Sequence, residues 1–160
     1  MTRRGRLAVI LYAAAAGAYV LDRLTKFLAV QFLAGKPPVQ VIHHVVQLRY
    51  TTNAGGAFGL FGSQPWLFFA ATLLVCAAIV IGSARLSSSV GAIGLGLILG
   101  GALGNLTDRI LRGPGVSGRV VDFIDFRVWP VFNLADSAIV VGAAVILVAG
   151  LRRQSGADAD

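Results

Sequence analysis

The sequence predicts an all-α integral membrane protein with four transmembrane helices and a small β-sheet outside the membrane. Of its 160 residues, 56% are hydrophobic and 13% are charged, and the mean hydropathy is +0.78. A soluble globule needs more polar surface than this composition provides. Apolar stretches approaching the roughly 20 residues that span a hydrocarbon core recur four times. We therefore expect one membrane-embedded domain over residues 1–160.

The four spans are expected at about residues 7–33, 66–84, 91–110 and 132–151. Three arginines before the first span imitate a secretory signal peptide, but the three later spans favour an uncleaved first helix. Gly96, Gly100 and Gly104 recur every four residues in the third span and predict close helix packing. The single cysteine, Cys76, falls within the second span, where we expect a buried small hydrophobe.

Two segments between the spans predict a small sheet at the membrane surface. Residues 39–52 and 119–128 are rich in β-branched residues in rough alternation, as in strands. All five prolines lie in the parts of the chain between the spans, where they do not interrupt a transmembrane helix. His43 and His44 are adjacent, and strand neighbours point to opposite faces, which is poor geometry for a shared metal. We expect both histidines at the surface.

The distribution of arginine predicts the orientation in the membrane. With four spans, both termini lie on one side, together with the loop around Arg85. That side carries six arginines, and its only acids are the tail residues Asp158 and Asp160. This favours cytoplasmic termini by the positive-inside rule, although the other side holds eight basic residues. The net charge of +7 is scattered through apolar sequence, so we expect lipid headgroups rather than nucleic acid as partners.

Polar residues in or near the spans fall at one membrane face. Such residues are costly in a bilayer and are functional candidates by default. Because helices alternate direction, the end of the first span, the end of the third and the start of the fourth meet on one side. Every acid outside the tail lies in this layer, and the chain has no glutamate. The span residues concerned are Asp22, Lys26, Asn105, Asp108, Arg109, Asn133 and Asp136.

Each polar group also has a purely structural interpretation. Asp22 and Lys26 are spaced i, i+4 and can pair as an interfacial anchor. Asp108 and Arg109 can form a solvated helix end. Asn133 can cap the fourth helix.

The residue types narrow the possible chemistry to carboxylates. The histidines lack a nucleophile motif such as G-x-S-x-G, Cys76 is mid-membrane, and no H-E-x-x-H occurs. Two close carboxylates share a proton and can hydrolyse an amide as base and acid. Clustered aspartates can instead hold Mg²⁺ for phosphotransfer, and composition leaves both open. A small transporter is disfavoured, because its coupling carboxylate is expected near the bilayer midplane.

Five motifs in series resemble lipoprotein signal peptidase, signal peptidase II. They are DRLTK (22–26), NAGGAF (53–58), GGALGNLTDR (100–109), VVDF (120–123) and FNLAD (132–136). The resemblance implies a membrane aspartic protease of the bacterial inner membrane that cuts prolipoproteins before a diacylglyceryl-modified cysteine. It makes Asp122 and Asp136 the catalytic pair. Asp125, three residues further along a strand, is expected to face the opposite way and to be a structural or solvent-facing residue.

The resemblance also implies the surroundings of the catalytic pair. Residues 39–60 correspond to an extramembrane cradle and a flap, and globomycin-like cyclic peptides are expected to bind. No metal or other cofactor is implied, and we expect a monomer with its site near the outer face. Gly56 and the long link at 111–118 depart from the family pattern. Binding, orientation or local structure is implied for Asn53, Gly55, Asn105, Asp108, Arg109, Asn133, Asp22 and Lys26.

Overall fold

The computed structural model describes residues 1–55 and 64–157, except the side chains of 153–157, and contains four long helices and a three-stranded sheet. Within this part of the chain, the four helices are long and apolar enough to cross a membrane. The elements are α1 (Arg3–Leu33), β1 (Val39–Ile42), β2 (Val46–Asn53), α2 (Pro65–Gly82), the 3₁₀ turn η2 (Ser83–Arg85), α3 (Ser89–Leu111), β3 (Val120–Asp125) and α4 (Leu134–Ala157). The fold class predicted from the sequence is confirmed.

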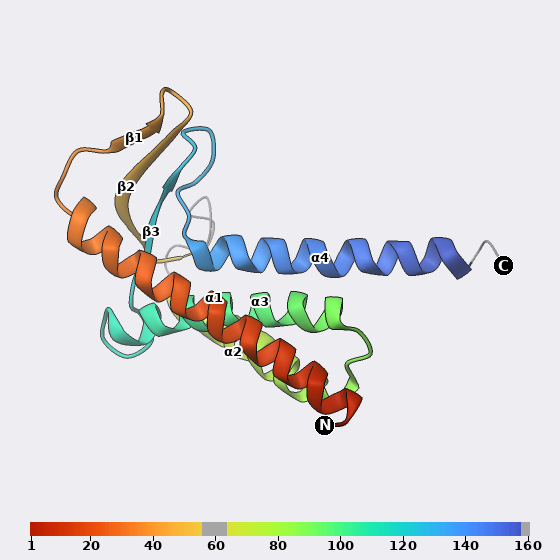
Figure 1. Cartoon of the computed structure of the whole chain (residues 1–160). Helices are drawn as coiled ribbons and strands as arrows, with labels where there is room; N and C mark the ends of the chain where they lie inside the picture. The colour runs from red at the N-terminus through yellow and green to blue at the C-terminus, as the bar shows by residue number, and fades with distance from the viewer. Residues whose placement is uncertain (56–63, 158–160) are drawn as a thin grey trace.

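The sheet lies at one end of the helices, and the start of α1 and the end of α4 lie at the other (Figure 1). Its order is β1-β2-β3 with both pairs antiparallel. The strands predicted within residues 39–52 are confirmed as a hairpin, but His43 and His44 lie in its turn and not in a strand, where they were expected. His44 adopts a left-handed backbone conformation with φ of 60°, which no strand accommodates. Both histidines are exposed, as predicted.

Glycines on two faces of α3 place this helix between α1 and α4. Gly96 and Gly100 pack against the α1 backbone at Leu11 and Ala15, and a Cβ at either glycine would collide with these carbonyls. On the other face, Gly101 packs in the same way against Ala135 of α4. The packing ridge predicted from the glycine repeat is confirmed, and a second one accompanies it. Close approach of three helices brings their polar ends together.

The outward surfaces of the helices are apolar, as expected for a protein solvated by lipid. Large hydrophobic side chains such as Leu74, Ile81 and Val140 are exposed, whereas Cys76 is buried as predicted. The most deeply buried side chains include Lys26, Asp22, Asp108 and Asn133. This inverts the pattern of a soluble protein, in which charged side chains are almost never fully buried.

Candidate active site

The predicted polar layer lies where α1, α3 and α4 meet β3. Asp22, Lys26 and Asp108 are all 0% exposed. Lys26 Nζ lies 3.0 Å from Asp22 Oδ2 and 3.0 Å from Asp108 Oδ2. Asp108 also pairs through Oδ1 with Arg23 Nη1 at 2.6 Å and Arg112 Nε at 2.8 Å. The i, i+4 pair predicted for Asp22 and Lys26 is present, but its burial contradicts an interfacial anchor, and the burial of Asp108 contradicts a solvated helix end.

This ion cluster, defined as Asp22, Lys26 and Asp108, also fixes the elements that carry the other carboxylates. Asp22 Oδ1 accepts a hydrogen bond from the Ala135 backbone N–H at 3.0 Å, at the start of α4. Asp108 Oδ2 accepts from the Val121 backbone N–H at 3.2 Å, in β3. Each bond ends one residue before a predicted catalytic aspartate. The cluster thus positions Asp136 and Asp122 without contacting them directly.

Asparagine side chains hold Asp122 and Asp136. Lys26 Nζ donates to Asn105 Oδ1 at 2.8 Å, and Asn105 Nδ2 donates to Asp136 Oδ1 at 2.8 Å. Because the lysine ammonium is only a donor, it fixes the orientation of this amide and aims its N–H group at Asp136. Asn133 Nδ2 donates to Asp122 Oδ1 at 2.7 Å and to Asn105 Oδ1 at 3.2 Å. The two aspartates are therefore linked through a pair of amides.

Asp136 and Asn133 form a reciprocal cap at the start of α4. Asn133 Oδ1 accepts from the Asp136 backbone N–H at 2.9 Å, and Asp136 Oδ2 accepts from the Asn133 backbone N–H at 3.3 Å. This satisfies N–H groups that a helix start leaves without partners. The predicted cap at Asn133 is confirmed, and the same residue also contacts Asp122.

Asp122 and Asp136 line one cavity of about 270 Å³ between β3, α3 and α4. Of the predicted site residues, Asn53, Gly55, Asn105 and Arg109 line it as well. Asp22, Lys26, Asp108 and Asn133 do not line the cavity and instead support the residues that do, or their chain neighbours, through hydrogen bonds. Sequence reasoning missed Phe68 and Thr72 of α2 and the aromatic residues Trp129 and Phe132, which also line the cavity. The three aromatic residues and a lone threonine within an apolar span gave no signal that set them apart in a membrane protein.

Arg109 brings a nearly buried positive charge to the cavity. It is 7% exposed, and its guanidinium carbon lies 5.5 Å from the centre of the Phe68 ring. Its charge interacts with those of Asp122 and Asp136. Nη1 of Arg109 has no hydrogen-bond partner among the described residues. An unsatisfied buried donor is costly, so a bound acceptor at this point would be stabilised.

The surroundings of Asp122 favour its protonated form. Burial, followed by the negative charge of Asp136, raises the pKa of Asp122 from 3.8 to about 7, against the opposing effects of Asn133, Asn53 and Lys26. Among residues 1–55 and 64–152, neither Asp122 nor Asp136 forms an ion pair. Two carboxylates in this setting can hold one proton between them near neutral pH.

Asp125 has a different environment from Asp122. Its carboxylate accepts hydrogen bonds from Arg49 Nε at 2.6 Å, Gln47 Nε2 at 2.7 Å and the Arg127 backbone N–H at 2.7 Å. Burial alone raises the pKa of Asp125, but these hydrogen bonds outweigh it and hold the pKa below its ordinary value. Asp125 does not line the cavity described above. It fastens β2 to β3, in agreement with the structural role expected for it.

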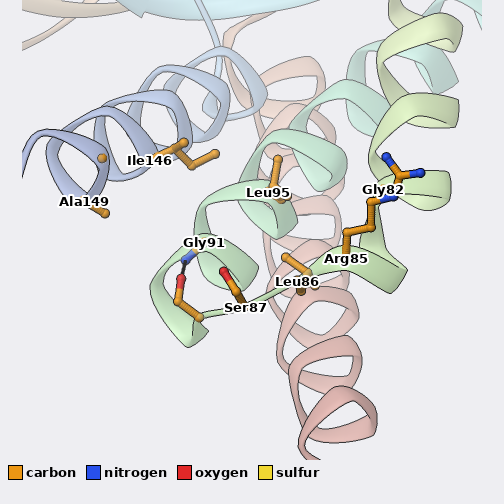
Figure 2. Close-up of a pocket in the computed structure, with 10 residues that line it drawn as sticks. Gly82, Arg85, Leu86, Ser87, Gly91, Leu95, Ile146 and Ala149 are labelled. Atoms are coloured by element: carbon orange, nitrogen blue, oxygen red, sulfur yellow. Dashed lines mark hydrogen bonds between the residues drawn. The ribbon is translucent and has the colours of Figure 1, made fainter. Parts of the chain in front are cut away.

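A second hollow lies at the opposite end of the bundle, where the α2–α3 link meets the last turns of α4 (Figure 2). Its volume is about 290 Å³, and Arg85, Leu86, Ser87 and Ile146 contribute to its walls. None of its lining residues is an acid, and none was predicted as a site residue. It therefore offers no pair of carboxylates, unlike the cavity at Asp122 and Asp136.

Part of the predicted cradle and flap lies outside the described residues. The β1–β2 hairpin is described, whereas residues 56–60, including Gly56, are not. Within the described part of the chain, no group of three or more histidine, cysteine or acidic side chains is placed to hold a metal ion.

Comparison with known proteins identifies the family of the chain. Residues 14–152 match the family model described as Signal peptidase (SPase) II. The chain belongs to the signal peptidase II family. It is 44% identical over 153 residues to a lipoprotein signal peptidase of Rhodococcus jostii, covering 92% of this chain and 74% of that protein. It is 45% identical over 156 residues to a lipoprotein signal peptidase of Streptomyces coelicolor, covering 94% and 74%.

A solved structure shares the fold. It is a bacterial membrane enzyme that is 28% identical in sequence, with a TM-score of 0.80 over 91% of this chain and 90% of that chain. The resemblance inferred from the five motifs is thus confirmed at the level of the family. As a signal peptidase II, the chain is a peptidase and a multi-pass protein of the bacterial inner membrane.

Proposed function

We propose that the protein removes signal peptides from prolipoproteins as an aspartic endopeptidase, cutting before a diacylglyceryl-modified cysteine. The observation that carries this proposal is that Asp122 and Asp136, from two different elements, line one cavity without an ion-pair partner among the described residues. The relatives named lipoprotein signal peptidase support the choice of substrate.

In the proposed reaction, Asp122 begins protonated and Asp136 begins ionised. Asp136 removes a proton from a water molecule while the water oxygen attacks the scissile carbonyl carbon. Asp122 gives its proton to the carbonyl oxygen, which produces a tetrahedral diol. The C–N bond then breaks as Asp136 passes its proton to the leaving nitrogen and Asp122 recovers one from the diol. No covalent enzyme intermediate forms, and the dyad returns to its starting state.

The other cavity residues orient the substrate. The unpartnered Nη1 of Arg109 donates to a substrate carbonyl oxygen near the scissile bond. The polar side chains of Asn53 and Asn105 keep the dyad and the substrate backbone in register. Globomycin-like cyclic peptides occupy the same cavity as inhibitors. No metal takes part in the reaction.

The proposed orientation has both termini in the cytoplasm and the dyad near the outer face. Arginines at the end of the helices opposite the dyad support it by the positive-inside rule: Arg3 begins α1, Arg85 ends η2 and Arg152 lies in α4 beside the start of α3. The protein acts as a monomer, since one chain supplies both aspartates.

The deciding experiment compares a lipid-modified prolipoprotein with its unmodified counterpart. Purified protein in detergent with excess chelator should cut the lipidated substrate alone, before the modified cysteine. Equal cleavage of both substrates would refute the lipid requirement. Activity that disappears on chelation and returns with Mg²⁺ or Zn²⁺ would refute the metal-free mechanism.

A further inference from the structure

An apolar groove runs beside the catalytic cavity along the outward side of α4. Its volume is about 470 Å³. One wall consists of aromatic side chains from the segment that connects β3 to α4, and the other consists of valines on α4 itself. Polar side chains occur only at one end, where Asp136 and Ser137 contribute. The apolar walls are Phe126, Trp129, Phe132, Val140 and Val141.

The groove adjoins the catalytic cavity. Trp129, Phe132 and Asp136 line both hollows. Any substrate whose scissile bond lies at Asp122 and Asp136 therefore has the polar end of this groove next to it. A group attached close to the scissile bond can enter the groove directly.

The aromatic wall is held in place by the strand that carries Asp122. Phe126 and Phe132 stack with ring centres 5.5 Å apart and an interplanar angle of 22°. Phe132 also exchanges backbone hydrogen bonds with Ile124 of β3, at 3.0 Å and 2.9 Å. The groove thus exists before any ligand binds, as is usual for specific small-molecule sites.

The chemistry of the walls selects the type of occupant. A peptide backbone in this groove would leave its N–H and C=O groups without partners, which is costly where water is excluded. A hydrocarbon chain has no such groups. Its polar attachment point would meet Asp136 and Ser137, and its apolar end would meet the two valines. An amphiphilic group with one polar end therefore matches the groove along its whole length.

We propose that this groove binds one acyl chain of the diacylglyceryl group on the substrate cysteine and thereby selects lipidated substrates. The inference rests on the proposed function and adds to it the site at which the lipid is recognised. Because the surrounding bilayer is as apolar as the groove, selectivity comes from close packing against the fixed walls and not from hydrophobic transfer.

A groove-filling variant tests the proposal. Val140 is 67% exposed and lipid-facing, so Val140→Trp should insert normally while its indole occupies the groove. The matched control is Val20→Trp on α1, where the valine is 59% exposed. Val20 lies two residues from Asp22, whose carboxylate reaches the start of α4, so the control lies at a similar depth.

The substrates are one prolipoprotein carrying either palmitoyl or hexanoyl chains on its glyceryl group. Val140→Trp should raise KM for the palmitoyl substrate roughly tenfold with little change in kcat, and raise it less for the hexanoyl substrate. Val20→Trp should behave as the wild type. Phe126→Ala removes a wall of the groove instead of filling it. It should also raise KM more for the palmitoyl substrate than for the hexanoyl substrate.

Two results would overturn the inference while leaving the proposed function intact. In one, both groove variants match Val20→Trp on the palmitoyl substrate. In the other, the loss is equal for both chain lengths, which would assign the groove to the peptide part of the substrate. Failure of the wild type to cut the palmitoyl substrate would instead contradict the proposed function.

Discussion

Two neighbouring sets of carboxylates in one polar layer differ in the partners that surround them. Asp22 and Asp108 contact Lys26, and Asp108 contacts two arginines as well. Asp122 and Asp136 receive hydrogen bonds from asparagine amides. Both sets are buried or partly buried at the same end of the helices.

The difference shows how one residue type serves two purposes. At Asp108, three cations share the carboxylate and favour its ionised form, so this residue supports structure. A carboxylate held by neutral amides beside a second carboxylate can gain or lose a proton near neutral pH. Asp108 and Asp122 are both buried, so what distinguishes them is the cation partners, which Asp108 has and Asp122 lacks among the described residues.

The largest expected effect is on catalysis. Asp122→Asn and Asp136→Asn should each reduce cleavage of the lipidated substrate by at least about 10³-fold, because each removes one member of the proton-sharing pair. The double variant should be scarcely worse, since the pair acts as a unit. Single-turnover cleavage by purified, correctly inserted protein measures this. Near-normal cleavage by either single variant would exclude the dyad mechanism.

The ion cluster should respond through stability. Asp108→Ala leaves Lys26, Arg23 and Arg112 without their shared carboxylate, and breaking a buried pair costs roughly 3–5 kcal/mol. We expect a large fall in the thermal midpoint in detergent. A variant that kept its midpoint but lost cleavage would show Asp108 to be chemical rather than structural.

Asp122→Asn should change stability in the opposite direction. Because burial raises the pKa of Asp122 to about 7, the wild type loses stability as pH rises from the ordinary value of 3.8 towards 7. The asparagine variant carries no charge and avoids this loss, which amounts to at most about 4 kcal/mol. Its advantage in thermal midpoint should be small at about pH 4 and level off above about pH 7. An advantage that shrinks with rising pH would contradict the pKa shift.

The smallest effect is expected at Asp125. Asp125→Asn weakens a contact with Arg49, whose side chain is partly exposed, so the cost should be about 1 kcal/mol. Since the pKa of Asp125 is lowered, this cost should be present at neutral pH and vanish as acid protonates the wild-type carboxylate. Cleavage should be largely retained. An activity loss as large as that of Asp122→Asn would place Asp125 in the mechanism.

The spans and the convergence of polar residues were predictable because both depend on periodicity and on the cost of charge in a bilayer. The hairpin turn at His43 and His44 was not, because its β-branched surroundings lack the glycine, asparagine or proline typical of turns. Arg112 lies four residues after Asp108, so its ion pair could have been predicted from helical spacing. The pair between Arg23 and Asp108 could not, because it depends on how α1 packs against α3.

Hydrogen bonds between a side chain and a distant backbone group also could not be predicted from the sequence. The bonds from Ala135 to Asp22 and from Val121 to Asp108 depend on tertiary approach alone. The same is true of the groove beside Asp136. Its aromatic residues are close in sequence, but only the folded connector turns them towards α4.

The most direct test of the central claim is infrared titration of protein labelled with ¹³C-aspartate. The C=O stretch of a protonated carboxyl should titrate near pH 7 in the wild type and be absent from the Asp122→Asn variant. It should persist in Asp125→Asn. Absence of any protonated carboxyl within about two pH units of neutrality, or its persistence in Asp122→Asn, would contradict the account.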